Sequence, residues 1–256
     1  MVRRIVPRRL SHEEEATLVE HLTELRHRLV ICLVALVPAF AIAYAFHEQL
    51  ISRLLDLLPE GTPVVTLGVT EPFTTSLKVS FYAALAIMLP LVLWQIWAFF
   101  APAVAEDTQR VIGVFVVFAT CLFAAGVAFC YLIVLPRALE FLVDYDSELY
   151  VEQIRASYFL SFVTLTLFAF GIAFQMPIFI LGLVRIGALT ASRLRRNRRI
   201  GYVLMLAFAI ILPTVDPVSL VLEVVPLLVL FELSIWLSVF MERRWERGAE
   251  AEAEPL

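Results

Sequence analysis

The chain has 256 residues, of which 61% are hydrophobic and 17% are charged, and its mean hydropathy is +0.87. Soluble domains carry about 45–50% apolar and ~25% charged residues, so the composition excludes an ordinary soluble domain. Glycine is scarce, at 9 residues, and no low-complexity tract or repeat of fixed period is visible, which excludes collagen-like and solenoid proteins. The class that remains is a polytopic membrane protein.

Long stretches without charge indicate the membrane spans. Four runs of 18 to 29 residues come close to or exceed the roughly 20 apolar residues that cross a ~30 Å hydrocarbon core: 29–46, 79–105, 111–136 and 156–184. A fifth run, 200–215, has 16 residues, and two glutamates interrupt a sixth apolar segment, 217–241. The runs are continuous rather than alternating, which favours helices over a barrel. The predicted fold class is an all-α polytopic membrane protein with six transmembrane helices, of which the fifth and sixth are short.

Three prolines interrupt the apolar runs. Pro38, Pro90 and Pro177 lie in the first, second and fourth spans, where a helix that loses a backbone hydrogen bond tends to bend. Bent helices beside a short fifth span predict a concave bundle rather than a straight-walled cylinder.

The distribution of positive charge predicts the orientation in the membrane. With six spans both termini lie on one side, and that side carries 16 of the 20 Lys and Arg residues, whereas the opposite loops are acidic. Positive residues remain on the cytoplasmic side of a membrane protein. We therefore expect a multi-pass protein of the cytoplasmic (inner) membrane, with both termini in the cytoplasm.

The ends of the chain are less apolar than its centre. We expect one six-span domain, 1–241, that begins with an amphipathic cytoplasmic helix at about 12–28. Ser11 and Glu14 fit a capping box ahead of this helix. Four leucines then recur at helical spacing: Leu18, Leu22, Leu25 and Leu29. The hydrophobic pattern is lost in 242–256, which predicts a disordered cytoplasmic tail.

The common catalytic signatures are missing from the sequence. There is no Walker loop and no G-x-S-x-G, and His21 and His27 do not have the spacing of a zinc-binding His-Glu-x-x-His motif. We therefore expect no enzyme, no catalytic residue, no cofactor and no metal site.

Polar residues inside the spans are the main local leads, because they are costly in lipid. Gln175 in the fourth span has two interpretations, an interhelical hydrogen bond or a contact with lipid or a partner. Glu223 and Glu232 are nine residues apart and so point to nearly opposite faces of the sixth span. Glu223 is expected to reach water at the outer end, whereas Glu232, near mid-span, needs a partner, a proton or a water-filled cavity.

Six short motifs carry a more specific signal. They are HLTELRHRL at 21–29, WAFFAP at 97–102, YFLSF at 158–162, Phe170-Gly171 with Pro177, Leu212-Pro213 with Asp216, and Phe231-Glu232. In register over about residues 18–241, they resemble the motifs of the TatC family, the multispanning receptor subunit of the twin-arginine protein translocase.

The resemblance implies a fold and a set of partners. TatC proteins have six spans with cytoplasmic termini and bind the twin-arginine signal peptides of folded precursors at the cytoplasmic face. They work with TatA- and TatB-type single-span proteins, and the proton-motive force drives export. The implied partners are these subunits, signal peptides, further copies in a larger complex and membrane lipid, with no nucleic acid.

The resemblance also assigns candidate residues. Signal-peptide binding is expected at Glu24, Arg26, Arg28, Phe99, Glu106 and Asp107. Intramembrane polar or partner contacts are expected at Gln175, Glu223 and Glu232, and Asp216 is an outer-loop functional candidate. Glu24 occupies the Glu position of the family's HLxELRxR motif, which helps to receive the twin arginines, and a carboxylate accepts the fork of a guanidinium. Without the resemblance, an i,i+4 pair with Arg28 is the favoured interpretation of Glu24.

The sequence departs from the family at three positions. Thr108 replaces a second Glu after the second span, and Glu106 and Asp107 lie nearby to supply the charge. In the fourth span, where the family has Glu or Gln, Gln175 is the form that cannot titrate. Arg53 replaces a proline of the outer loop ahead of the second span.

Two other classes of function remain open. A small ion-coupled secondary transporter would use Gln175 and Glu232 as a midplane site, although no inverted repeat relates the two halves. A structural membrane scaffold would bind no ligand. Neighbouring genes for single-span amphipathic proteins would favour translocation over both.

Overall fold

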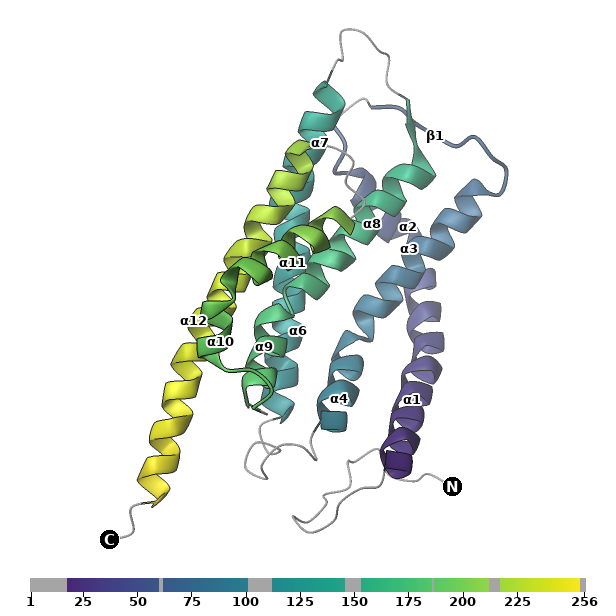
Figure 1. Ribbon diagram of the computed structural model, residues 1–256. Coiled ribbons are helices and arrows are strands. Elements are labelled where there is room, and N and C mark those ends of the chain that lie inside the picture. The colour runs from purple at the N-terminus through teal and green to yellow at the C-terminus, as the bar shows by residue number, and fades with distance from the viewer. Residues whose placement is uncertain are drawn as a thin grey trace, which may run out of the picture.

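The computed structural model describes residues 18–59, 62–100, 112–145, 153–185, 187–211 and 217–253. Almost all of these residues are helical (Figure 1). The elements in chain order are α1 (Leu18–Ala45), α2 (His47–Leu55), β1 (Val64–Val65), α3 (Glu71–Ile87), α4 (Leu89–Phe100), α6 (Ile112–Phe129), the π-helical η2 (Cys130–Val134), α7 (Leu135–Asp144), β2 (Ile154–Arg155), α8 (Ala156–Ala173), α9 (Met176–Arg185), α10 (Ala191–Arg196), α11 (Arg198–Ile211) and α12 (Pro217–Ala253).

Several of these helices are long and apolar enough to cross a membrane. Four helical segments meet that description, His21–Ala45, Gly113–Asp144, Ala156–Arg185 and Pro217–Glu242. Helices α3 and α4, which meet at an angle of 49°, meet the same description only when taken together as one bent span. Helix α11 has 14 residues and a length of about 21 Å, and it coincides with the uncharged run 200–215, which the sequence predicts as a short fifth span.

Of the three prolines at which bends are expected, two lie directly after a break in a helix. The second span breaks between α3 and α4 just before Pro90, and the fourth breaks between α8 and α9 just before Pro177. The first helix, in contrast, continues through Pro38 without interruption. The third span accommodates Pro136 with the π-helical turn η2, because a wider turn makes room for a ring that would crowd the carbonyl four residues earlier.

The helices form a bundle in which α8 and α9 are central. Helix α1 packs on α3, α3 packs on α8, and α6 packs on both α4 and α8. On the other side α12 packs along α9 and α11, as Figure 1 shows. In the same view α1 begins and α12 ends at one end of the bundle, while the short parallel pair of β1 and β2 lies near the opposite end.

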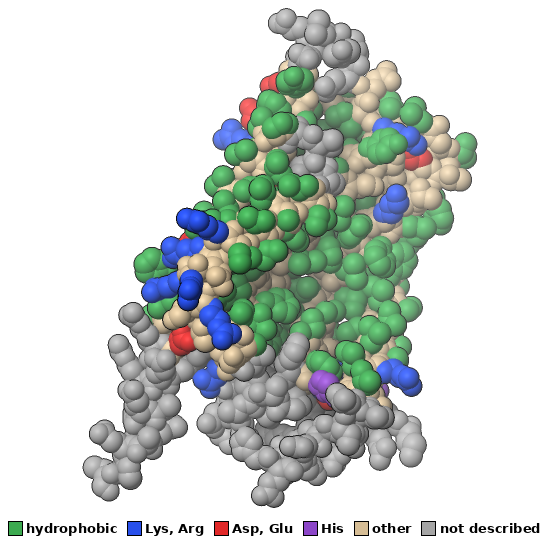
Figure 2. All heavy atoms as spheres, in the orientation of Figure 1, with side chains coloured by type: hydrophobic (Ala, Val, Ile, Leu, Met, Phe, Trp, Pro, Cys, Tyr) green, Lys and Arg blue, Asp and Glu red, His purple; other side chains and the backbone are tan. Residues whose placement is uncertain are grey.

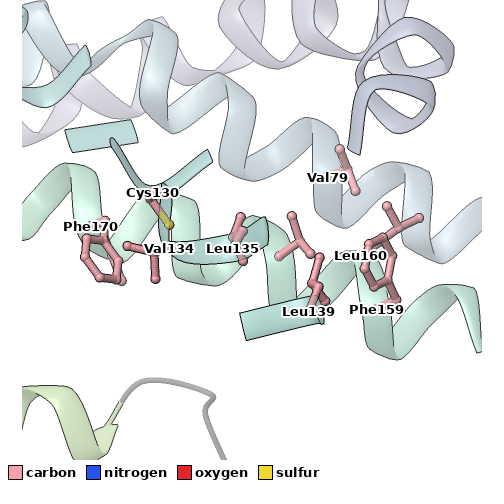
Figure 3. Close-up of a cluster of buried hydrophobic side chains, with 10 residues drawn as sticks. Val79, Cys130, Val134, Leu135, Leu139, Phe159, Leu160 and Phe170 are labelled. Carbon is pink, nitrogen blue, oxygen red and sulfur yellow. The ribbon is translucent and has the colours of Figure 1, made fainter. Parts of the chain in front are cut away.

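The largest buried cluster joins α3, η2, α7 and α8 (Figure 3). It contains Val79, Cys130, Val134, Leu135, Leu139, Phe159, Leu160 and Phe170. Two glycines allow helices to approach elsewhere: a Cβ on Gly171 would lie 2.3 Å from the ring of Phe123, and one on Gly201 would lie 2.0 Å from the ring of Phe231. Without a hydrophobic effect between helices in lipid, such close packing is what holds the bundle together.

The C-terminal helix corrects two expectations. With 37 residues α12 is the longest helix described, so the sixth span is not short. The helix continues to Ala253, where the sequence predicts a disordered tail from residue 242. Glu, Ala and Arg are good helix formers, and extending an existing helix requires no new nucleus. At the other end, the predicted capping box lies outside the described residues.

Candidate functional site

The end of the bundle where α1 begins carries a polar contact between α1 and α4. The guanidinium of Arg28 donates from Nε to Oε1 of Glu24 at 3.2 Å, and its Nη2 also contacts that oxygen. Nη1 donates to Oε1 of Gln95 at 3.0 Å, and Nη2 donates to the carbonyl of Ala98 at 3.1 Å. Arg28 thus fastens α1 to the last turns of α4 and, at the same time, orients the Glu24 carboxylate.

An aromatic contact lies beside this network. The rings of His21 and Phe99 stack with their centroids 4.2 Å apart, which joins α1 to α4 a second time. We refer to Glu24, Arg28, Gln95, Phe99 and His21 together as the rim. The rim unites two motifs that are about 70 residues apart in the sequence, HLTELRHRL and WAFFAP.

Glu24 is the accessible acidic group of the rim. Its side chain is 36% exposed, whereas that of Arg28 is 12% exposed. Within the described part of the chain, the hydrogen bonds of Glu24 all go to Arg28 through Oε1. Because Arg28 also has the acceptors of Gln95 and Ala98, Glu24 can turn toward a second guanidinium without leaving Arg28 unbonded.

The structure gathers only part of the expected signal-peptide site. Arg26 is exposed on α1 and forms no ion pair with any described residue. Glu106 and Asp107 lie outside the described residues, as does Asp216, the outer-loop candidate. Gln95 belongs to the rim, although the motifs do not predict it. The sequence does contain a signal for it, because Gln95 is the one amide side chain in the charge-free run 79–105, and polar groups are costly in lipid.

Gln175 is buried at the break between α8 and α9. Its Nε2 donates to the carbonyl of Ala119 in α6 at 3.0 Å, so the interhelical hydrogen bond is the arrangement that the structure shows. Its Oε1 is buried without a partner among the described residues. The backbone carbonyl of Gln175 accepts from Ile178 and Phe179, which restarts the helix after the bend.

Of the two glutamates of α12, Glu223 has an environment opposite to the expected one, whereas Glu232 has the expected one. Glu223 does not reach water: it is 1% exposed, in a buried stripe with Ser219 and Leu227 at four-residue spacing. Glu232 has the partner that the sequence predicts it needs. Its Oε2 lies 3.2 Å from Nη2 of Arg198, and its Oε1 accepts from the hydroxyl of Tyr202, both on α11.

A transporter site would require Gln175 and Glu232 to converge. Gln175 is hydrogen-bonded to α6, whereas Glu232 is paired with two residues of α11. Because these partners lie on different helices, no contact between described residues joins Gln175 and Glu232 into one midplane site.

Comparison with known proteins identifies the family. The model of the family "Sec-independent protein translocase protein (TatC)" matches residues 20–226. The chain belongs to the TatC family. Curated relatives named Sec-independent protein translocase protein TatC include one from Campylobacter jejuni, 35% identical over 84% of this chain and 90% of the relative. Another, from Escherichia coli K12, is 34% identical over 90% of this chain and 91% of the relative.

The fold agrees with a solved TatC structure. A crystal structure of the twin-arginine translocase receptor TatC in the detergent DDM superposes with a TM-score of 0.80 at 33% identity. The match covers 86% of this chain and 99% of that one. This TatC family member is therefore an all-helical polytopic membrane protein and a component of the Sec-independent translocase, which functions with other Tat subunits. The family is one of transport subunits rather than enzymes.

A second polar centre, which the sequence motifs do not predict, lies at the opposite end of the bundle. Glu71, at the start of α3, is buried and accepts at Oε1 from Nε of Arg155 at 3.0 Å and from the backbone of Ser157 at 3.3 Å. Its Oε2 accepts from the backbone of Leu67 and Gly68. The bond to Glu71 raises the pKa of Arg155 above its usual value. Glu71 thereby connects the loop before α3 to the start of α8.

Proposed function

We propose that this chain is the receptor subunit of a twin-arginine translocase and that its rim binds the paired arginines of signal peptides. The observation that supports this proposal most strongly is the Glu24 carboxylate, which is partly exposed and is held in place by Arg28. The solved TatC structure, which the chain matches over most of its length, is that of a twin-arginine translocase receptor.

The chemistry of the rim suits a guanidinium. Arginine carries a permanent, delocalised charge and a planar fork of donors, which a carboxylate accepts in a bidentate manner. Glu24 already accepts a hydrogen bond from one guanidinium, that of Arg28. We propose that it accepts hydrogen bonds from a signal-peptide guanidinium in the same way. We propose that Glu106 and Asp107 supply further negative charge for the second arginine, because the family's second Glu is replaced by Thr108.

We propose an inner-membrane location with both termini in the cytoplasm. The cation distribution of the sequence supports this orientation. In Figure 2 Lys and Arg side chains gather over α10 and α11, while hydrophobic side chains cover the middle of the same face. Those two helices carry Arg193, Arg195, Arg196, Arg198 and Arg199. In this orientation the rim faces the compartment in which precursors are made and folded.

The partners we propose are TatA- and TatB-type single-span subunits and further copies of the chain, with export driven by the proton-motive force. Glu232, with Arg198 and Tyr202, lies partly exposed along α11 and α12 and is our candidate for contact with a partner helix. Gln175 and Glu223 are buried, so we assign them to the packing of the bundle rather than to partner contact.

Photocrosslinking of a twin-arginine signal peptide to the chain in membranes tests the receptor function. Losing one partner of a charge-assisted pair costs about 1.5–3 kcal/mol, roughly 10- to 150-fold in affinity. We therefore expect Glu24→Ala to lose most of the crosslinked product while the protein still inserts and folds. The matched control is Glu140→Ala, another exposed glutamate in an ion pair, on α7. Equal crosslinking by Glu24→Ala and the control would refute the proposal.

A further inference from the structure

A groove of about 480 Å³ lies where α3 is flanked by α1 and α8, away from the rim. Its walls are largely apolar and include Phe40 of α1, Leu77 and Phe81 of α3, and Leu165 of α8. Helices α1 and α8 are long and apolar enough to cross a membrane, as is α3 together with α4, so we place the groove on the lipid-facing surface of the bundle. Nothing in the proposed binding of signal peptides uses it.

One charged residue, Lys78, lines the groove. Lys78 is exposed on α3, directly before the charge-free run 79–105, and about 10 Å along the helix from its first residue. An ammonium at this depth reaches toward the interface along its flexible stem, with its methylene groups on the apolar wall. Lys78 therefore places an exposed positive charge beside a largely apolar groove.

Lys78 has no acidic partner within the described residues, whose ion pairs all involve other cations. Glu71, about two turns earlier on the same helix, forms an ion pair with Arg155 instead. Two hydroxyl groups in the lining, those of Tyr82 and Ser161, add hydrogen-bond donors. The groove therefore presents one uncompensated cation and two neutral donors beside an apolar surface.

We propose that this groove binds an anionic phospholipid, with the phosphate on Lys78 and one acyl chain against Phe40, Phe81 and Leu165. Lys78 favours a negatively charged headgroup, and the apolar walls favour an acyl chain. A soluble anion would contact Lys78 but would leave the apolar walls uncovered. The site lies on α3, which begins near the end of the bundle where β1 and β2 pair (Figure 1). A twin-arginine segment carries charge of the wrong sign for it.

Native mass spectrometry of the purified full chain in detergent tests the proposal. The probes are phosphatidylglycerol and phosphatidylcholine with identical acyl chains. We expect phosphatidylglycerol to bind about tenfold more tightly, as for one charge-assisted contact. Lys78→Gln removes this preference and Lys78→Arg keeps it. The matched control, Arg137→Gln, changes another exposed cation, on α7, and leaves the preference unchanged. Leu165→Trp fills the groove and weakens binding of both lipids.

Three results would overturn the lipid site. The first is an unchanged preference in Lys78→Gln, and the second is displacement of phosphatidylglycerol by excess inorganic phosphate. The third comes from a benzophenone amino acid at Phe81 in membranes: the site predicts a crosslink to lipid, and a crosslink to a signal peptide instead would assign the groove to the peptide. Glu24 does not line the groove, so Glu24→Ala is expected to leave the lipid measurement unchanged, and failure of the receptor proposal would be recognised separately.

Discussion

Single side chains of this protein hold together segments that are distant in the sequence. Arg28 bonds Glu24 on its own helix and two groups of α4, and Glu71 accepts four hydrogen bonds from the loop before α3 and the start of α8. The Glu24–Arg28 pair and Glu71 lie at opposite ends of the bundle, and their carboxylates differ in exposure. Glu71 is enclosed by its donors, whereas Glu24 retains exposure with which to bind something else.

Neutralising Glu71 tests its structural role. Glu71→Gln keeps the shape of the side chain but removes the charge opposite Arg155 and replaces one acceptor oxygen with a donor, which then faces a backbone N–H or the guanidinium. We expect a lower midpoint of thermal unfolding in detergent, measured by circular dichroism. Glu140→Gln, which alters an ion pair exposed on both sides, is expected to leave the midpoint unchanged. Equal midpoints for the two variants would contradict the role we assign to Glu71.

At the scale of elements, the prediction from sequence succeeds where a local feature determines the structure. The length of the runs without charge locates the spans, and Pro90 and Pro177 mark the helix breaks that the structure shows. Prediction is less successful where tertiary packing decides. Pro38 leaves α1 continuous, and the burial of Glu223 depends on which face of α12 meets its neighbours. No local pattern carries that information, since spacing gives the relative direction of two side chains but not which one faces the core.

The packing of α11 on α12 depends on a glycine. A Cβ at Gly201 would lie 2.0 Å from the ring of Phe231, which is itself buried, so the ring has little room to move. Gly201→Ala is expected to destabilise the fold by about 1–3 kcal/mol, the usual cost of overpacking. Thermal unfolding in detergent measures the effect. In the control Gly113→Ala the nearest atom lies 3.9 Å from the new Cβ, and no loss is expected.

A second change distinguishes the contact from a general effect of the substitution. Combining Gly201→Ala with Phe231→Leu removes the ring, so the double variant is expected to be more stable than the sum of the single effects indicates. Strict additivity of the two substitutions would show that Gly201 and Phe231 do not interact as described.

The whole molecule combines a polar rim at one end, an apolar middle and a second polar centre at the other. Of the expected signal-peptide residues, the rim brings together Glu24, Arg28 and Phe99, which the motifs predict. Gln95 was not predicted, because its role depends on which helix lies beside Arg28. The pairing of α12 with α11 through Glu232 likewise follows from the arrangement of the helices rather than from spacing.

The orientation of the molecule is testable with single cysteines in a chain whose three native cysteines are replaced by alanine. Val69 is fully exposed in the loop before α3, and Asn197 is exposed between α10 and α11. With both termini in the cytoplasm, a membrane-impermeant thiol reagent added from outside is expected to label Val69→Cys and not Asn197→Cys. Labelling of Asn197→Cys alone would invert the topology and place the rim on the outer side.

The most direct test of the receptor proposal is a double-mutant cycle between Glu24 and the twin arginines, measured as the affinity of the purified chain for signal peptides. Replacing both arginines of the peptide with glutamine is expected to weaken binding to the parent chain by roughly 10- to 150-fold, as expected for loss of a charge-assisted pair. In Glu24→Gln the same replacement is expected to cost clearly less affinity, because only the contact of Glu106 and Asp107 with the second arginine is left to lose. An equal loss of affinity in both chains would show that Glu24 does not recognise the twin arginines.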